Sequence, residues 1–130
     1  MPARKKEVER LRGRARAFLD LARVALKKGY FDLASFNGEQ YLQLTLKAEL
    51  LELAGDYPRT HELRRLLRLI GEGRSSGDKA EAFIKRHVDL ITKVEDAYVT
   101  TRYHTRDIEK AEAEHIIKFA LKVKKFVKSL

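Results

Sequence analysis

The sequence predicts an all-α fold, an up-and-down antiparallel helical bundle of four long helices and one short helix. Among its 130 residues only Pro2 and Pro58 are prolines, and both lie outside the segments that have helical periodicity. Within those segments apolar residues recur at intervals of three and four, which is the spacing of one face of an α-helix. The length is that of one ordinary domain with a single core, so residues 1–130 are expected to form one domain.

The first two segments predict an antiparallel helical hairpin. Residues 4–28 carry one apolar stripe, formed by Val8, Leu11, Ala15, Phe18, Leu19, Ala22 and Leu26. Gly29 is expected to end this helix, and Asp32 is expected to cap the next. The second segment, residues 33–53, has leucines on two nearly opposite sides, which indicates a central helix. So short a connection places the two helices side by side.

Three polar residues of the second helix, Asn37, Gln40 and Lys47, share one apolar line with Leu33 and Leu51. Burying an unpaired amide or ammonium costs about 1–3 kcal/mol or more, so these side chains need partners. Two interpretations remain open: a polar layer that specifies packing or a dimer, or the floor of a binding site.

The remaining helices are predicted from caps and apolar seams. Thr60 is expected to cap the short helix, and residues 71–77 to form a flexible connection. Asp78 with Glu81 is expected to open a helix whose seam runs through Ala80, Phe83, Ile84, His87, Ile91, Val94 and Tyr98. Residues 99–104 interrupt the pattern. Thr105 is expected to cap the last helix, whose seam contains Ile108, Ala111, His115, Phe119, Val123 and Phe126.

Positive charge is concentrated at the two ends of the chain. The net charge is +9, residues 1–30 hold ten Lys or Arg against three acids, and residues 116–130 hold five lysines and no acid. A basic helix can bind phosphates, but the arginines of the first helix flank its apolar stripe on both sides and can simply be solvated. A phosphate-binding surface is the alternative, extended by Lys118, Lys122 and Lys125 if the first and last helices are neighbours.

Several classes of protein are disfavoured by composition. The chain has no cysteine, so disulfides and Cys-ligated metals are excluded, and no apolar run approaches the roughly 18 residues of a membrane span. The basic N-terminus lacks the apolar core of a secretory signal, and a cytoplasmic protein is expected. No metal-binding or catalytic motif is present, and no cofactor is predicted.

Three short stretches resemble the HEPN family, helical domains linked to nucleotide handling. Residues 35–40 (SFNGEQ), followed by Leu46-Lys47-Ala48, are similar to the second-helix signature of that family. Residues 58–63 (PRTHEL) resemble its turn into the short third helix. Asp96-Ala97-Tyr98 and Thr101-Arg102-Tyr103 resemble its motif before the last helix. Asn37 and Gly38 stand where members often have His and Ala, and Tyr41 where Ala is common.

The resemblance implies a bundle that commonly dimerises, and a minimal nucleotidyltransferase as partner, often in a toxin-antitoxin pair. It also raises ribonuclease activity, which some members perform with an R-x(4–6)-H motif. None of the four histidines here has an Arg five to seven positions before it. The sequence therefore predicts a non-catalytic HEPN-type protein, a homodimer and nucleotidyltransferase partner that binds a nucleotide or RNA phosphates. The alternatives are a metal-independent ribonuclease with a displaced site at Arg102 and His104, and a structural helical adaptor.

The candidate nucleotide or anion-binding residues are Arg59, His61, Arg102, Tyr103 and His104. Both groups are expected at helix starts, where free backbone N–H groups and the positive end of the dipole favour phosphate. Loop and capping roles are the alternative. The sequence leaves open whether the two groups meet.

Overall fold

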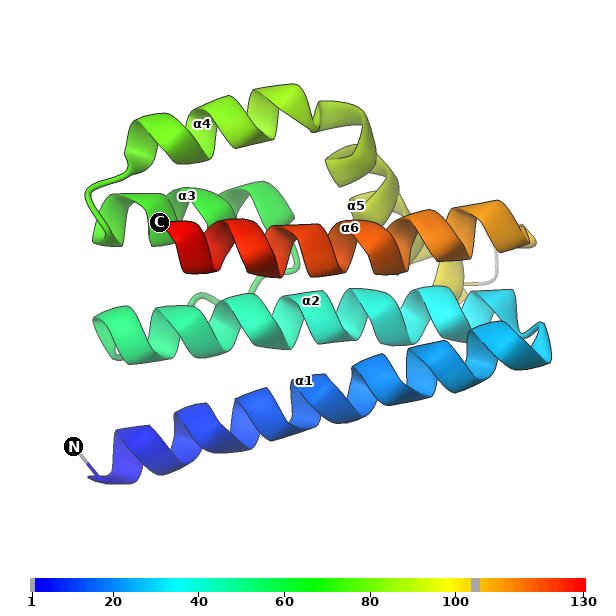
Figure 1. Ribbon diagram of the computed structural model, residues 1–130, viewed down its shortest axis with the longest axis horizontal. Coiled ribbons are helices and arrows are strands. Elements are labelled where there is room, and N and C mark those ends of the chain that lie inside the picture. The colour runs from blue at the N-terminus through cyan, green and yellow to red at the C-terminus, as the bar shows by residue number, and fades with distance from the viewer. Residues whose placement is uncertain (1, 104–105) are drawn as a thin grey trace.

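The computed structural model describes residues 2–103 and 106–130, which form an all-α bundle of six helices (Figure 1). The helices are α1 (Pro2–Lys28), α2 (Phe31–Ala54), α3 (Leu63–Gly73), α4 (Gly77–Arg86), α5 (Val88–Tyr103) and α6 (Lys110–Ser129). The predicted all-α fold is confirmed. Within these ranges no helix has the length and apolar character needed to cross a membrane.

The predicted hairpin of α1 and α2 is present, with the two helices antiparallel along their lengths (Figure 1). Gly29 ends α1 with a φ of 81°, a left-handed conformation that glycine adopts without strain. The predicted Asp32 cap is wrong, because Tyr30 occupies the N-cap position and makes no side-chain cap. Asp32 lies inside the first turn of α2, where its charge suits the helix dipole.

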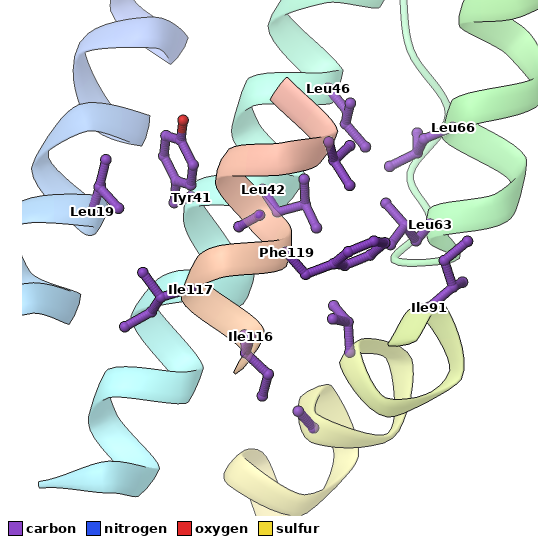
Figure 2. Packing of buried hydrophobic residues seen from close by; sticks show 14 of the residues in the cluster. Leu19, Tyr41, Leu42, Leu46, Leu63, Leu66, Ile91, Ile116, Ile117 and Phe119 are labelled. Carbon is purple, nitrogen blue, oxygen red and sulfur yellow. The ribbon is translucent and has the colours of Figure 1, made fainter. Parts of the chain in front are cut away.

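Helix α2 is central, as its two-sided apolar pattern predicts. Leu42 and Leu46 are fully buried, and Figure 2 shows them among side chains from α3, α5 and α6. The line that carries the polar seam lies instead at the edge of the core. Leu33 is 50% exposed and only Leu51 on this line is buried, while Asn37, Gln40, Leu44 and Lys47 are half-buried.

The segment after α2 folds back along that helix. Gly55, with a φ of 84°, ends α2, and the Gln43 Nε2 group donates a hydrogen bond to the His61 backbone oxygen at 2.9 Å. Residue 61 therefore lies beside the middle of α2, and α3 runs in the same direction as α2 (Figure 1). Thr60 does not cap α3 as predicted. Glu62 is the N-cap residue. The backbone N–H of Glu62 donates a hydrogen bond to the Thr60 hydroxyl at 3.1 Å.

Residues 71–77 are not the flexible connection that their composition predicts. Helix α3 continues to Gly73, and α4 begins at Gly77, so the predicted Asp78–Glu81 cap is wrong: Ser76 is the N-cap residue. Gly71 is buried where α4 crosses α3. A Cβ atom at Gly71 would lie 2.6 Å from the Cβ of Ala80, so only glycine permits this close approach.

The single helix predicted over residues 78–98 is wrong, because the chain turns at His87 and forms α4 and α5 (Figure 1). The ring of His87 packs on Phe83 at 4.4 Å and on Phe119 at 5.7 Å. No glycine or proline marks the turn, so it depends on tertiary packing. It directs α5 across the end of the core, where Ile91 is buried.

The predicted interruption at residues 99–104 is also wrong as far as the described residues extend, since α5 continues to Tyr103. Thr105, the predicted cap, lies outside the described residues. Helix α6 begins with a capping box between Glu109 and Glu112. Its buried stripe is shifted from the prediction: it contains Ala113, Ile116, Ile117, Phe119, Ala120, Val123 and Val127, and His115 is exposed.

Candidate functional site

A groove of about 390 Å³ lies between α2, the segment 55–62 and α5. It brings together five residues that the sequence nominated separately. Gln40 and Lys47 come from the polar seam of α2, Arg59 and His61 from the segment that folds back along α2, and Arg102 from α5. The geometry therefore joins the polar seam to both candidate anion-binding groups, which the sequence left open.

Aromatic rings contact two of the basic residues of the groove, His61 and Arg102. The His61 ring stacks on Tyr98 with a centroid distance of 4.0 Å and an interplanar angle of 6°. The Arg102 guanidinium lies 4.4 Å from the Tyr98 ring centroid and 5.6 Å from that of Phe36. These are cation–π distances, and such contacts position the guanidinium without neutralising it.

The predicted helix-start position is wrong for Arg102. This residue lies in the last turn of α5, where the helix dipole is negative. The positive charge in the groove therefore comes from side chains and not from a helix N-terminus. Tyr103 is 71% exposed and does not line the groove. His104 lies outside the described residues.

The polar seam divides between two environments. Lys47 lines the groove, with its Nζ atom 6.0 Å from the centroid of the Tyr57 ring. Burial lowers the pKa of Lys47, and the nearby Glu39 carboxyl partly opposes this. Asn37 is absent from the groove lining, and its Nδ2 group donates to the Leu33 backbone oxygen at 2.8 Å. Of the seam, Gln40 and Lys47 therefore belong to the candidate site.

Glu39, which sequence reasoning missed, lies behind the groove and is only 1% exposed. Gln40 Nε2 donates to its Oε2 atom at 2.9 Å. Burial raises the pKa of Glu39 to about 7, and Gln40, Arg102 and Lys47 only partly oppose the increase. A signal was present in the sequence, since Glu39 lies near Leu42 and Leu46 on a helical projection of α2.

The basic residues of the two end segments lie outside the groove. Arg12 pairs with Glu49 at 3.2 Å and with Glu52 at 3.1 Å, which fastens α1 to α2. Burial and the nearby Lys128 are the main causes that lower the pKa of Lys124 on α6. Arg16 and Arg12 of α1 lower it further. The lysines expected to extend a basic surface are all exposed, namely Lys118, Lys122 and Lys125.

Cationic and amide side chains line the groove. The described residues contain no group of three His, Asp or Glu side chains placed to hold a metal ion. A comparison with protein families matches residues 8–130 to the model described as the HEPN domain. No curated protein matches the sequence. The family match spans nearly the whole chain and every element that forms the groove.

Proposed function

Because the chain belongs to the HEPN domain family, a family of nucleotide-binding and ribonuclease-like domains, we propose that its groove binds a nucleotide or the phosphates of an RNA. One observation carries the proposal: Lys47, Arg59, His61 and Arg102 converge on a single hollow from three separate segments. In the described ranges, neither Arg59 nor Arg102 makes an ion pair with a carboxylate, so their charge is available to a ligand.

The groups present suit the two parts of a nucleotide. Guanidinium groups bind phosphate oxygens with two parallel hydrogen bonds, and Lys47 adds a point charge. The stacked rings of His61 and Tyr98 offer a planar surface beside these cations. Bases stack on such rings with little regard to sequence, which fits a nucleotide or a single-stranded RNA.

The biological role we propose is that of a non-catalytic partner of a minimal nucleotidyltransferase, as in a toxin-antitoxin pair. Family membership and the missing R-x(4–6)-H motif support this role. We also propose a homodimer, supported by half-exposed leucines on the hairpin, where Leu21 is 54% and Leu33 is 50% exposed. Co-expression with the nucleotidyltransferase encoded by a neighbouring gene, followed by size-exclusion chromatography with light scattering, tests both associations.

A ribonuclease with a displaced site is the second candidate, and one contact favours it. Tyr98 touches both His61 and Arg102, so an imidazole and a guanidinium from distant parts of the sequence lie at one ring. His61 is then the histidine that pairs with Arg102, in place of the His104 named from the sequence.

Binding and cleavage are tested with the same proteins. We expect AMP and a 5′-labelled oligouridylate to bind wild type at low salt, and to bind Arg59→Ala and Arg102→Ala at least ten-fold more weakly, since each variant loses about 1.5–3 kcal/mol of charged hydrogen bonding. Arg86→Ala, an exposed arginine on α4, is the matched control. Equal binding by all four proteins would contradict the proposal. Intact RNA supports the non-catalytic role, whereas cleavage lost in both His61→Ala and Arg102→Ala supports the ribonuclease.

The role of the polar seam is tested by Gln40→Leu. We expect this change to alter self-association or ligand binding more than solubility, because Gln40 lines the groove and also bonds to Glu39. If the oligomeric state and the affinity both stay unchanged, Gln40 contributes only to packing.

A further inference from the structure

A second hollow, of about 320 Å³, lies between the N-terminal half of α3 and α5, and we call it the α3 hollow. Its lining consists of basic and acidic side chains, namely His61, Glu62, Arg64, Arg65, Arg68 and Glu95. His61 also lines the groove described above, and it is the residue that the two linings share. The groove and the α3 hollow therefore adjoin at His61.

The groove carries unbalanced positive charge. Lys47, Arg59 and Arg102 are among the residues that line it, and its lining contains no carboxylate. Guanidinium and ammonium groups form their strongest hydrogen bonds with anionic oxygen atoms. The phosphate part of a nucleotide therefore suits the groove.

The charge of the α3 hollow is largely balanced. Two of its arginines, Arg64 and Arg68, are each paired with a glutamate. Glu62 and Arg65 lie one turn apart at the start of α3, and in the described ranges neither forms an ion pair. Glu62 offers a carboxylate that accepts hydrogen bonds, and Arg65 offers a guanidinium that donates them. Because the edge of a nucleobase is neutral and has both donors and acceptors, it suits this hollow better than a phosphate does.

The ring of His61 provides a surface on which a base can stack. Tyr98 covers one face of the imidazole, with a centroid distance of 4.0 Å. No other aromatic ring among the described residues stacks on His61, which is exposed, so its second face is open. Tyr98 lines the groove and not the α3 hollow. The open face of His61, turned away from Tyr98, therefore lies toward the α3 hollow.

We propose that a nucleotide lies across His61, with its phosphate in the groove and its base stacked on the open face of the imidazole in the α3 hollow. This inference rests on the function proposed above, because it requires a phosphate in the groove, and it adds the place and the contacts of the base. Glu62 accepts hydrogen bonds from N–H groups of the base, and Arg65 donates to its ring nitrogen or carbonyl oxygen atoms.

The arrangement predicts how the two parts of the ligand contribute to affinity. Inorganic phosphate occupies only the groove, whereas AMP occupies the groove and the α3 hollow. A base stacked on a side-chain ring contributes about five-fold to 100-fold to affinity. AMP is therefore expected to bind more tightly than inorganic phosphate, and the difference is expected to depend on the ring of His61.

NMR on the full chain labelled with 13C and 15N locates the base, with inorganic phosphate and AMP as probes. Both probes are expected to shift the backbone amides of residues 57–60. AMP alone is expected to shift the ring protons of His61 and the amides of residues 62–68. If AMP shifts only the signals that phosphate shifts, the base lies outside the α3 hollow, and this inference is overturned while the proposed function stands. If neither probe shifts any signal of the groove, both are overturned.

Variants of His61 test the stacking by titration with the same two probes. His61→Ala is expected to weaken AMP binding by about five-fold or more beyond any loss for inorganic phosphate, and His61→Phe, which keeps a ring, is expected to restore most of the AMP affinity. His115→Ala, at an exposed site on α6 outside both linings, is the matched control. Circular dichroism checks that each variant is folded.

The pattern across the variants separates the two proposals. Arg59→Ala is expected to weaken the binding of both probes, and if it weakens neither, the proposed function fails. Equal losses of AMP and phosphate affinity in His61→Ala, or no recovery in a folded His61→Phe, would overturn the stacking of the base on His61 even where Arg59→Ala behaves as expected.

Discussion

The buried carboxyl of Glu39 makes a specific prediction about stability and pH. Its pKa is about 7 in the folded protein and 4.5 when exposed to water. Between these values the folded state binds more protons than the unfolded state. Stability is therefore greatest below about pH 4.5, as far as this group is concerned, and declines as the pH rises to about 7. Replacing Glu39 with glutamine removes this dependence.

The magnitude follows from the shift in pKa. A rise from 4.5 to about 7 is roughly 2.5 units, and each unit corresponds to about 1.36 kcal/mol. Ionising Glu39 in the folded protein therefore costs roughly 3 kcal/mol of stability above pH 7. This is a large part of the 5–15 kcal/mol that is typical of a folded domain.

Urea unfolding followed by circular dichroism measures the effect, because the described residues form an all-α fold. We expect the stability of Glu39→Gln minus that of wild type to rise by about 3 kcal/mol between pH 4.5 and pH 7.5. His87 has the opposite effect, since burial and the nearby Lys122 and Arg86 lower its pKa, but it is present in both proteins and cancels. Parallel stability curves for the two proteins would refute a neutral buried Glu39.

Three further predictions concern the helix crossings and the groove. Gly71→Ala is expected to cost about 1–3 kcal/mol in urea unfolding because of the clash with α4, whereas Gly77→Ala, where no atom lies within 4 Å of the added Cβ, is expected not to destabilise; equal losses would contradict the close approach. Glu49→Gln weakens the ion pairs that hold Arg12 and Arg74, and a loss of about 1–3 kcal/mol is expected; no change in the urea midpoint would show that these pairs are balanced by desolvation. Arg59→Ala is expected to reduce the slope of log affinity for oligouridylate against log salt by up to about one unit, and an unchanged slope would exclude a phosphate contact at this residue.

Helical periodicity predicted much of the fold, for a physical reason. The apolar stripes of α1 and α2 must be buried, and this requirement determines which side of each helix faces the core. Val8, Ala22 and Leu42, which lie on these stripes, are all buried. The turn at His87 left no such mark. Its packing on Phe83 and Phe119 depends on α6, which is distant in the sequence.

The candidate site was predicted as separate residues and not as a groove. Arg59, His61 and Arg102 were each predicted separately, because they are basic residues in stretches that resemble family motifs. Whether they meet depends on the course of residues 55–62, and the decisive contact is one hydrogen bond from Gln43 to a backbone oxygen. No local pattern encodes such a bond, so the sequence left the meeting open.

The two sides of the groove differ in how firmly they are held. Lys47 projects from α2, a helix buried on several sides by α1, α3, α5 and α6 (Figure 1), and its backbone is held by regular helical bonds. Arg59 and His61 lie in a segment without helical bonds, attached to α2 through Gln43. Exposed segments with few bonds open most easily, so a ligand is expected to slow amide exchange mainly in residues 57–62 and little in α2. Equal protection on both sides would indicate that the ligand stabilises the whole bundle, and that the segment is not the adaptable wall.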